Sequence, residues 1–562
     1  MFELPEIDEE IYKRLSHHDL TQCARVCKKW HRSVVPHLWR NFNIVTNYRE
    51  DYVHDMVLED YLYEQQQLQL RSEDMKPQPS HFMPRLAKYV VIPDPEATAV
   101  ELLRHVYKRC PNLQVHFLDV TVLCQFEDIS KTIAEFLLPT VRILSLHISE
   151  PWCLKYLLNH CTDTLVELYL NVTIWPDADM NDKKDQQLQE ELKTLKSLKK
   201  LVLEKAHDNS ASKSFWQWLF KRCSHVERLE VVYIREIHQI LADNMLTYMP
   251  NLSEIRFGRD RYQTYIISDK DIAVLLSGSR QGWKVVEFKQ TMPFGDVVKG
   301  VLMKHFPTLE KLILDGVYGI CGHDLTSILS SSPNLHSLIA FVIDYSSLCK
   351  FSPINPNKFI DYGPTPGLLK RWPYEITLRV LKIRIFDIPR PDLKGDRVIK
   401  EIYPGEGRQI QIQVYERLAG LINLETLWLG HIPNRIPGLP MFVDTEYQCD
   451  CLEMSLESGM HKLAGLKSLK ELNVTGMKTR IGLEEVQWMI ENWPRIGILL
   501  FVDGNDAPDN LDAVAWLHEH HPEIKLEGKK TAWIETAWME TAWIERNDSL
   551  VKALPYWLKE KM

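Results

Sequence analysis

The stretch Leu165-Val166-Glu167-Leu168-Tyr169-Leu170 carries the pattern that recurs most often in this chain. The pattern is an apolar residue, two residues, a second apolar residue, one residue and a third apolar residue. Its last two apolar positions have the spacing of one face of a β-strand, so each copy predicts a short strand with one buried face. Other clear copies are Leu198/Leu201/Leu203, Leu309/Leu312/Leu314, Leu424/Leu427/Leu429 and Leu469/Leu472/Val474, and weaker copies start at Leu86, Leu113, Val141, Val226, Leu252, Trp283, Leu335, Leu378 and Ile496.

The spacing of these copies identifies the type of repeat. Most follow one another at 24 to 33 residues, and three longer intervals of 43 to 46 residues lie between Leu335 and Leu469. Leucine-rich repeats have a period of roughly 20 to 29 residues. Between the strands the apolar spacing changes to the helical period, as in Leu154/Leu157/Leu158 and Leu325/Ile328/Leu329. Several helices are expected to stop at a proline, as at Met249-Pro250-Asn251, because proline cannot continue a helix.

These features predict an α/β fold of repeated helix-turn-strand units. One unit cannot bury its own apolar face, so neighbours should stack into a leucine-rich-repeat solenoid, a horseshoe whose parallel strands line the concave side. An ordinary doubly wound sheet is the alternative, but it would need varied unit lengths and a phosphate-binding turn. Loops in the long intervals, such as 351–356 and 431–437, either enlarge a binding face or are neutral insertions.

The chain ends in a short repetition that does not belong to this pattern. Thr531-Ala532-Trp533-Ile534-Glu535 is followed by two further copies. The second copy has Met539 at the position of Ile534, and the third has Ile544 there. A five-residue step does not keep three tryptophans on one face of a helix or a strand. This favours a recent duplication with little structural purpose, and a partner-binding tail is the alternative.

Composition shifts set the expected domain boundaries. A polar stretch with Gln65-Gln66-Gln67 and Pro77-Gln78-Pro79 is typical of a linker before the repeats. The sequence therefore predicts a helical domain at 1–42, a linker at 43–85, the repeats at 86–527 and the tail at 528–562.

The first forty residues predict two or three short helices. Ile7, Ile11 and Leu15 recur at four-residue steps, on one face of a helix whose first turn is acidic. Asp19 can cap a second helix with Gln22 three residues later, and apolar residues then recur at steps of three and four. So small a module has more apolar positions than it can bury internally, so we expect it to dock on a partner.

This segment resembles the F-box, and the chain as a whole resembles the F-box/leucine-rich-repeat proteins. The resemblance rests on Leu4-Pro5, the apolar helix positions and Val26-Cys27-Lys28-Lys29-Trp30. It implies that the segment docks on a Skp-family adaptor, which joins a cullin-based SCF ubiquitin ligase. One departure is that the spacing from Leu4-Pro5 to Ile11 is shorter than the family's usual pattern. A helical cap for the first repeat is the alternative. The residues carried over as adaptor-binding are Leu4, Pro5, Ile7, Ile11, Leu15, Leu20, Val26, Cys27 and Trp30.

The resemblance implies a non-catalytic substrate receptor for ubiquitin-dependent protein degradation. The F-box would hold the ligase while the concave face of the repeats holds a target protein, so that the mechanism is proximity. A leucine-rich-repeat scaffold without ubiquitin chemistry is the alternative function. Side chains that follow the second apolar position of a strand should point to the concave face, and aromatic and Arg residues often dominate binding energy. The predicted target-binding residues are Tyr169, Glu230, Arg256, Glu287, Lys382 and Trp428, of which Tyr169, Arg256 and Trp428 are the first choices.

No residue pattern predicts catalysis, a metal or a cofactor. His518-Glu519-His520-His521 lacks the spacing of a His-Glu-x-x-His zinc helix and is typical of a solvated helix end. Cys23, Cys27 and His31 lie at four-residue steps, but their place in the amphipathic pattern favours core packing over metal binding. Cys449-Asp450-Cys451 lacks a second Cys or His pair.

Charge and hydropathy narrow the class of protein further. The 67 Lys and Arg against 76 Asp and Glu give a net charge of -9, which disfavours generic nucleic-acid binding. No stretch approaches the roughly 20 apolar residues that span a bilayer, and the first residues do not read as a signal peptide. We therefore expect an intracellular protein of the cytoplasm or nucleus, with its 11 cysteines mainly buried and reduced.

Overall fold

The structure is a computed structural model whose chain divides into two compact units, Met1–Trp283 (unit 1) and Lys284–Met562 (unit 2). Of the linker predicted at 43–85, residues 43–45 belong to the strand Phe42–Val45, and residues 46–85 lie outside the described residues. The tail predicted at 528–562 and all F-box positions except Val26 also lie outside them. The structure describes residues 26, 42–45, 86–92, 114–120, 141–148, 151–172, 193–207, 213–232, 234–235, 237–258, 267–288, 292–314, 317–318, 320, 322–340, 343–344, 350–351, 375–383, 385, 388–390, 392–393, 403, 405–430, 451–501 and 508–526.

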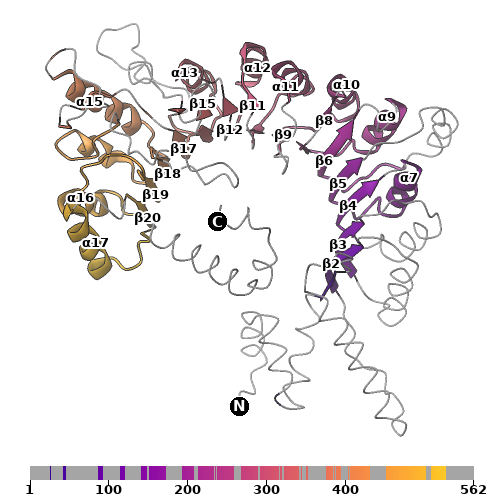
Figure 1. Cartoon of the computed structure of the whole chain (residues 1–562), viewed down its shortest axis with the longest axis horizontal. Helices are drawn as coiled ribbons and strands as arrows, with labels where there is room; N and C mark the ends of the chain where they lie inside the picture. Colours follow the sequence, from indigo (N-terminus) through magenta and orange to yellow (C-terminus); the bar gives the residue numbers. More distant parts are fainter. Residues whose placement is uncertain are drawn as a thin grey trace, which may run out of the picture. The chain divides into compact units, whose positions relative to one another are not determined.

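Unit 1 is built on a parallel sheet with the strand order β1-β2-β3-β4-β5-β6-β7-β9, and β8 pairs with β6. Figure 1 shows its described helices on one side of the strands. The strands are β1 (Phe42–Val45), β2 (Leu86–Ile92), β3 (Gln114–Val120), β4 (Ile143–Ile148), β5 (Glu167–Val172), β6 (Lys200–His207), β7 (Arg228–Val231), β8 (Ile234–Arg235) and β9 (Glu254–Phe257). The helices are α7 (Pro151–His160), α9 (Lys213–Arg222), α10 (His238–Tyr248) and α11 (Asp269–Leu276).

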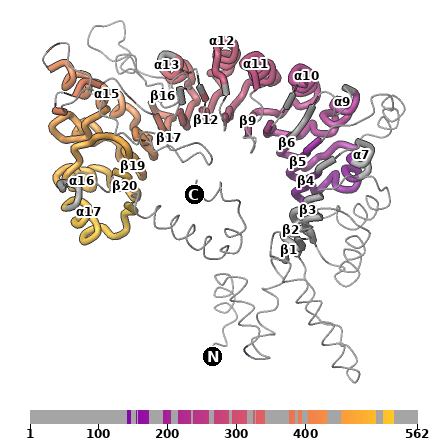
Figure 2. Tube along the Cα trace, in the orientation of Figure 1, coloured from indigo at the N-terminus to yellow at the C-terminus, as the bar shows by residue number. Residues whose placement is uncertain are grey.

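Unit 2 repeats the same architecture with the parallel order β10-β12-β14-β17-β18-β19-β20. The backbone trace in Figure 2 shows the alternation of strand and helix. The strands are β10 (Val285–Phe288), β12 (Lys311–Leu314), β14 (Ser337–Ala340), β17 (Val380–Ile383), β18 (Thr426–Trp428), β19 (Glu471–Asn473) and β20 (Ile498–Leu500), with the short pairs β11 (Met292–Pro293) and β13 (Val317–Tyr318), and β15 (Ile343–Asp344) and β16 (Lys350–Phe351). The helices are α12 (Asp296–Leu302), η4 (Met303–His305), α13 (Gly322–Ser331), α15 (Glu406–Ala419), η6 (Met460–Gly465), α16 (Leu483–Asn492) and α17 (Pro508–His520).

The core of each unit forms where the repeated apolar positions of adjacent strands align. In unit 1, Leu144, Leu168, Leu201, Leu229 and Ile255 are successive register partners, and each is 0% exposed. Stacking fully buries a side chain that a single unit would leave in water, and each such burial contributes about 1.5 to 3 kcal/mol. The predicted α/β leucine-rich-repeat fold is confirmed.

Two of the weaker repeat assignments were out of register. The pairing of β2, β3, β4 and β5 aligns Val90 with Leu118, and through Leu144 with Leu168. The second apolar position of the repeat is therefore Val90 in β2 and Leu118 in β3. The copies that start at Leu86 and Leu113 would place it at Tyr89 and His116. A strand alternates its faces at every residue, so only pairing with a neighbour fixes which set faces the core.

Proline stops helices where the sequence predicted it. Helix α10 ends at Tyr248, before Met249-Pro250, and α13 ends at Ser331, before Ser332-Pro333. The chain then turns into the next strand, because proline neither donates a backbone hydrogen bond nor fits the helix interior. Each turn therefore leads directly to the apolar residue that opens the next copy of the pattern, Leu252 or Leu335, and both are buried.

We expect the thiols of Cys161 and Cys223 to resist alkylation in the folded protein. Both side chains are at most 1% exposed, and burial raises the pKa of each thiol to about 12. Because the thiolate is the reactive form, neither should react with iodoacetamide at pH 8, and both should react after denaturation. Peptide mass spectrometry measures the labelled fraction, and rapid native labelling of either cysteine would contradict the packing.

Candidate functional site on the strand faces

Figure 1 shows the described helices on one side of the strands. The residues predicted to bind a target alternate along the strands with buried leucines such as Leu168 and Leu427, so they point to the opposite face. In unit 1, Tyr169 is aligned with Val202, Val202 with Glu230, and Glu230 with Arg256. The predicted residues of this unit thus stand in one row across four strands. A second row lies two residues earlier on the same strands, and it aligns Glu167, Lys200, Arg228 and Glu254.

Lys200 is the centre of a polar network on this face. Its Nζ lies 3.5 Å from Glu167 Oε2 and 3.7 Å from Glu230 Oε2, and it donates a 2.8 Å hydrogen bond to the Tyr169 hydroxyl. The Tyr169 hydroxyl in turn donates to Glu167 Oε2 at 2.9 Å. Burial raises the pKa of Tyr169 above its ordinary value, which keeps the hydroxyl neutral and able to donate at physiological pH.

A second group of ion pairs continues the network onto the next strands. Arg228 Nε donates to Glu254 Oε2 at 2.5 Å, and Arg256 Nη2 lies 3.6 Å from the same oxygen. Three cations and three anions are thus paired within one patch. We call these residues the unit 1 ladder: Glu167, Tyr169, Lys200, Arg228, Glu230, Glu254 and Arg256.

Unit 2 places different chemistry at the equivalent positions. Its row aligns Glu287, Ile313, Ile339, Lys382, Trp428 and Asn473 on successive strands. The Lys382 ammonium lies 3.2 Å from the centroid of the Trp428 ring, and Trp428 Nε1 donates to Glu471 Oε1 at 2.7 Å. Glu287 was predicted to face a target but is only 6% exposed, so it offers little surface to a partner.

Sequence reasoning overlooked half of each face. Lys200, Arg228, Lys311 and Glu471 directly precede the second apolar position, and they share a face with the residues that were predicted. The strand period of two was a sufficient signal, because residues two apart point the same way. The charges that pair across strands lie about thirty positions apart in the sequence. A local pattern of residues does not contain the strand register that brings them together.

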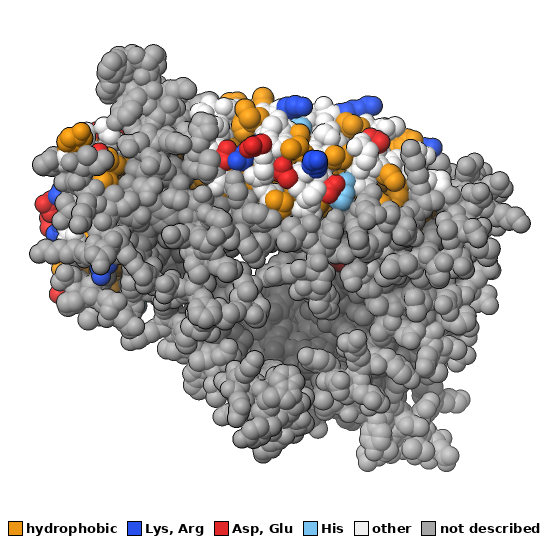
Figure 3. All heavy atoms as spheres, turned by 45° about the horizontal axis from the view of Figure 1, so that its top comes forward, with side chains coloured by type: hydrophobic (Ala, Val, Ile, Leu, Met, Phe, Trp, Pro, Cys, Tyr) orange, Lys and Arg blue, Asp and Glu red, His pale blue; other side chains and the backbone are white. Residues whose placement is uncertain are grey.

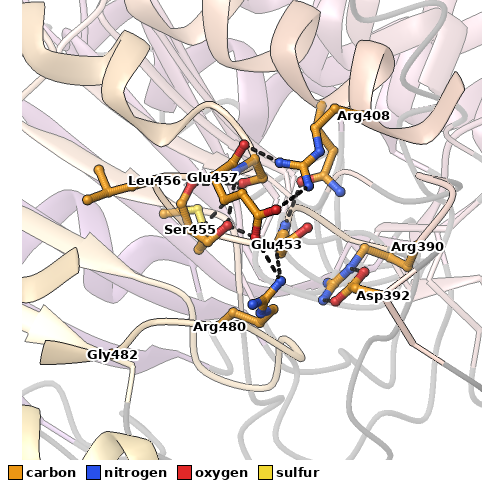
Figure 4. Close-up of polar contacts among 12 residues, drawn as sticks. Arg390, Asp392, Arg408, Glu453, Ser455, Leu456, Glu457, Arg480 and Gly482 are labelled. Atoms are coloured by element: carbon orange, nitrogen blue, oxygen red, sulfur yellow. Dashed lines mark hydrogen bonds and ion pairs between the residues drawn. The ribbon is translucent and has the colours of Figure 1, made fainter. Parts of the chain in front are cut away.

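A cluster of polar side chains around Arg390 is a different kind of site (Figure 4). The Arg390 guanidinium is 0% exposed and makes two 2.7 Å hydrogen bonds to the Asp392 carboxylate. It also donates to the carbonyl of Lys478 at 2.8 Å and, at 3.4 Å, to that of Cys451. Arg390 therefore ties together three chain segments that are distant in sequence.

The loop 451–459 is held by the same cluster. Arg480 pairs with Glu453 at 2.9 Å, and Ser455 donates to Glu453 Oε1 at 2.8 Å. Met454 has a left-handed φ of 55°, and its amide donates to the hydroxyl of Tyr415 on α15 at 2.9 Å. The buried groups of this cluster are occupied with one another, so we interpret it as a structural clamp for the long intervals of unit 2.

The histidines at the end of α17 contact other side chains and a backbone carbonyl. His520 Nδ1 lies 3.0 Å from the carbonyl of Trp516, its ring stacks on the Trp516 ring at 5.0 Å, and His521 Nδ1 lies 3.2 Å from Glu523 Oε1. Within the described part of the chain, no three His, Cys, Asp or Glu residues converge as metal ligands. The Cys23, Cys27 and His31 alternative lies outside the described residues.

The described surface carries no block of single charge in the view of Figure 3, where Lys and Arg, Asp and Glu, and hydrophobic side chains are interspersed. None of the helices in the described ranges has both the length and the hydropathy that a bilayer crossing requires.

Comparison with known proteins identifies one segment. Residues 5–45 match the family model described as F-box-like, and none of the curated proteins matches the chain. Similar solved structures include an internalin from Listeria monocytogenes str. 4b F2365, with 13% identity, 66% of this chain and 77% of that chain covered, and a TM-score of 0.32. A TLR13–ssRNA13 complex has 14% identity, 69% and 55% coverage, and a TM-score of 0.26. The Rad7 and Elc1 complex in yeast has 15% identity, 63% and 86% coverage, and a TM-score of 0.29. At these TM-scores none of the three structures indicates what this chain binds.

Proposed function

We propose, on the premise that this chain is an F-box protein with leucine-rich repeats, that it is the substrate-recognition subunit of an SCF-type cullin ubiquitin ligase. The F-box would bind a Skp-family adaptor and through it a cullin, and the strand faces would bind a target protein in the cytoplasm or nucleus. The observation that carries the proposal is that an F-box-like segment at residues 5–45 precedes a series of parallel strands with accessible side chains.

The proposed role needs no catalytic group in this chain. Binding a target beside a ubiquitin-charged partner raises the effective concentration of the target's lysines, and transfer would be carried out by other subunits. Val26, the one predicted adaptor-binding position within the described residues, lies in a helix and is 66% exposed. Its apolar side chain is therefore accessible to an adaptor.

Replacing Leu15 and Trp30 with alanine should abolish adaptor binding. The two side chains belong to the apolar pattern of the F-box-like segment, and apolar anchors supply most of the binding energy of such interfaces. The measurement is co-purification of the full chain with a Skp-family adaptor. Ile422→Ala is the matched control, because Ile422 is an exposed apolar side chain of unit 2 at 52% exposure. A folded wild-type chain that does not bind the adaptor would exclude the SCF role.

The scaffold alternative is separated from this proposal by deleting residues 1–41, which leaves β1 (Phe42–Val45) whole. If these residues only cap the repeats, the deletion should lower the melting temperature of unit 1, because its end would lose its cover. If they dock on the ligase, the repeats should keep their melting temperature while adaptor binding is lost.

A further inference from the structure

The strand face of unit 2 combines half-buried apolar side chains with two lysines. We call the following residues the unit 2 face: Lys311, Ile313, Ile339, Val380, Lys382 and Trp428. All six are neither fully buried nor fully exposed, and they lie on the adjacent strands β12, β14, β17 and β18. An apolar patch of this kind on a sheet is a site where a chain segment can dock.

The lysines of this face differ from the cations of the unit 1 ladder. Each cation of the ladder pairs with a glutamate, as described above. Among the described residues, no carboxylate forms an ion pair with Lys311 or Lys382. Glu471 accepts hydrogen bonds from Trp428 Nε1 at 2.7 Å and from Thr426 Oγ1 at 3.4 Å, and its charge acts on Lys382 without an ion-pair contact. Burial lowers the pKa of Lys382, because its ammonium group has lost part of its hydration. A carboxylate that binds beside Lys382 would compensate part of this loss.

The chain itself supplies a segment with matching chemistry. Residues 531–545 contain three Trp-Ile-Glu or Trp-Met-Glu triplets, with three glutamates and no Lys or Arg. The last described residue is Leu526, which directly follows Lys525. Lys525 forms a parallel bridge with Ile498 of β20, with its amide 2.9 Å from the Gly497 carbonyl. The segment therefore starts at the edge of the sheet whose face it complements.

We propose that residues 531–545 bind the unit 2 face in cis, with a repeat glutamate paired with Lys382 and the tryptophans against Trp428, Val380 and Ile339. This assigns a partner to the face and a role to the short repeats. It does not depend on the ubiquitin-ligase function. A target that uses the same face would have to displace this segment.

The segment can reach the face. Three strand spacings separate β20 from β17, which is roughly 14 Å. Eight residues lead from Lys525 to Trp533, and an extended chain of that length spans up to about 26 Å. A short tether also gives the segment an effective concentration on the order of millimolar, so even weak affinity is sufficient for occupancy. Three copies of the triplet offer three chances to place a glutamate beside Lys382.

Carbodiimide cross-linking of the full-length protein tests the proposal. The reagent joins a lysine amine to a nearby carboxylate as an amide, with loss of water, and peptide mass spectrometry identifies the pair. We expect links from Lys382 to Glu535, Glu540 or Glu545. Lys382→Arg should remove them, because the guanidinium does not form this link, and Trp533→Ala/Trp538→Ala/Trp543→Ala should reduce them to background by removing the apolar contacts.

Two internal controls make each outcome decisive. The exposed pair Lys470 and Glu425, 2.5 Å apart, should cross-link in every variant and so reports both reagent activity and an intact sheet. A mixture of unlabelled and 15N-labelled protein separates links within one chain from links between copies. Links within one chain support the proposal. Links only between copies, or no link at Lys382 while Lys470 and Glu425 react, would overturn it.

Discussion

Replacing Asp392 with asparagine should destabilise unit 2 by about 3 to 5 kcal/mol, the cost of leaving a buried charge without its partner. Arg390 is fully buried and makes two 2.7 Å hydrogen bonds to the Asp392 carboxylate. Among the described residues, this is the only carboxylate that forms an ion pair with Arg390. Asparagine keeps the volume of the side chain but removes the charge. The urea midpoint of unfolding should fall, while the slope of the transition stays the same.

The effect should depend on pH in one direction. Burial raises the pKa of Asp392, but the hydrogen bonds and charge of Arg390 outweigh it and hold the pKa below its ordinary value. The stabilisation is therefore complete above the unfolded pKa of about 3.9 and is lost as pH falls through the lower folded value. The difference between wild type and Asp392→Asn should be constant down to about pH 5 and shrink below about pH 4.

A surface ion pair of the same cluster is the control. Glu457 is 64% exposed and lies 3.2 Å from Arg408 and 3.4 Å from Arg480. Glu457→Gln should cost less than about 1 kcal/mol, because water screens exposed charges. Equal losses of stability for the two substitutions would contradict the isolation of Arg390 from solvent.

Gly430→Ala should be the second large effect, with a loss of about 3 kcal/mol through overpacking against backbone. A Cβ at this position would lie 2.2 Å from the Thr475 carbonyl oxygen and 2.5 Å from the Val474 carbonyl carbon. Those atoms directly follow β19, and the Gly430 amide donates at 3.1 Å to the carbonyl of Asn473, the last residue of β19. The backbones must separate to admit a methyl group, which breaks the pairing of β18 with β19.

Gly300→Ala is the matched control for this substitution. Gly300 lies in α12, and a Cβ there would meet nothing within 4 Å. Alanine also has a higher helix propensity than glycine, so the change should be neutral or stabilise by up to about 1 kcal/mol. Thermal unfolding of both variants compares them directly, and a loss at Gly430 no greater than at Gly300 would contradict the close approach.

Sequence alone determined the repeated architecture of this protein. The spacing of apolar residues located most strands, since a residue such as Leu168 or Leu427 must be buried and its neighbours two residues away must share its face. The same rule placed Tyr169 and Trp428 on the face opposite the helices. The F-box resemblance likewise rested on residue types at fixed spacing, and the family match at residues 5–45 supports it.

Tertiary structure decided what depends on pairing between distant segments. Register between strands corrected the frames of Leu86 and Leu113, and it set Lys200 between Glu167 and Glu230 in one unit while leaving Lys382 over an aromatic ring in the other. The burial of Arg390 could not be predicted, because the long intervals have no apolar period to locate it. Local periodicity encodes which face a side chain takes, whereas its charge partner and its burial are set by the neighbours that folding brings to it.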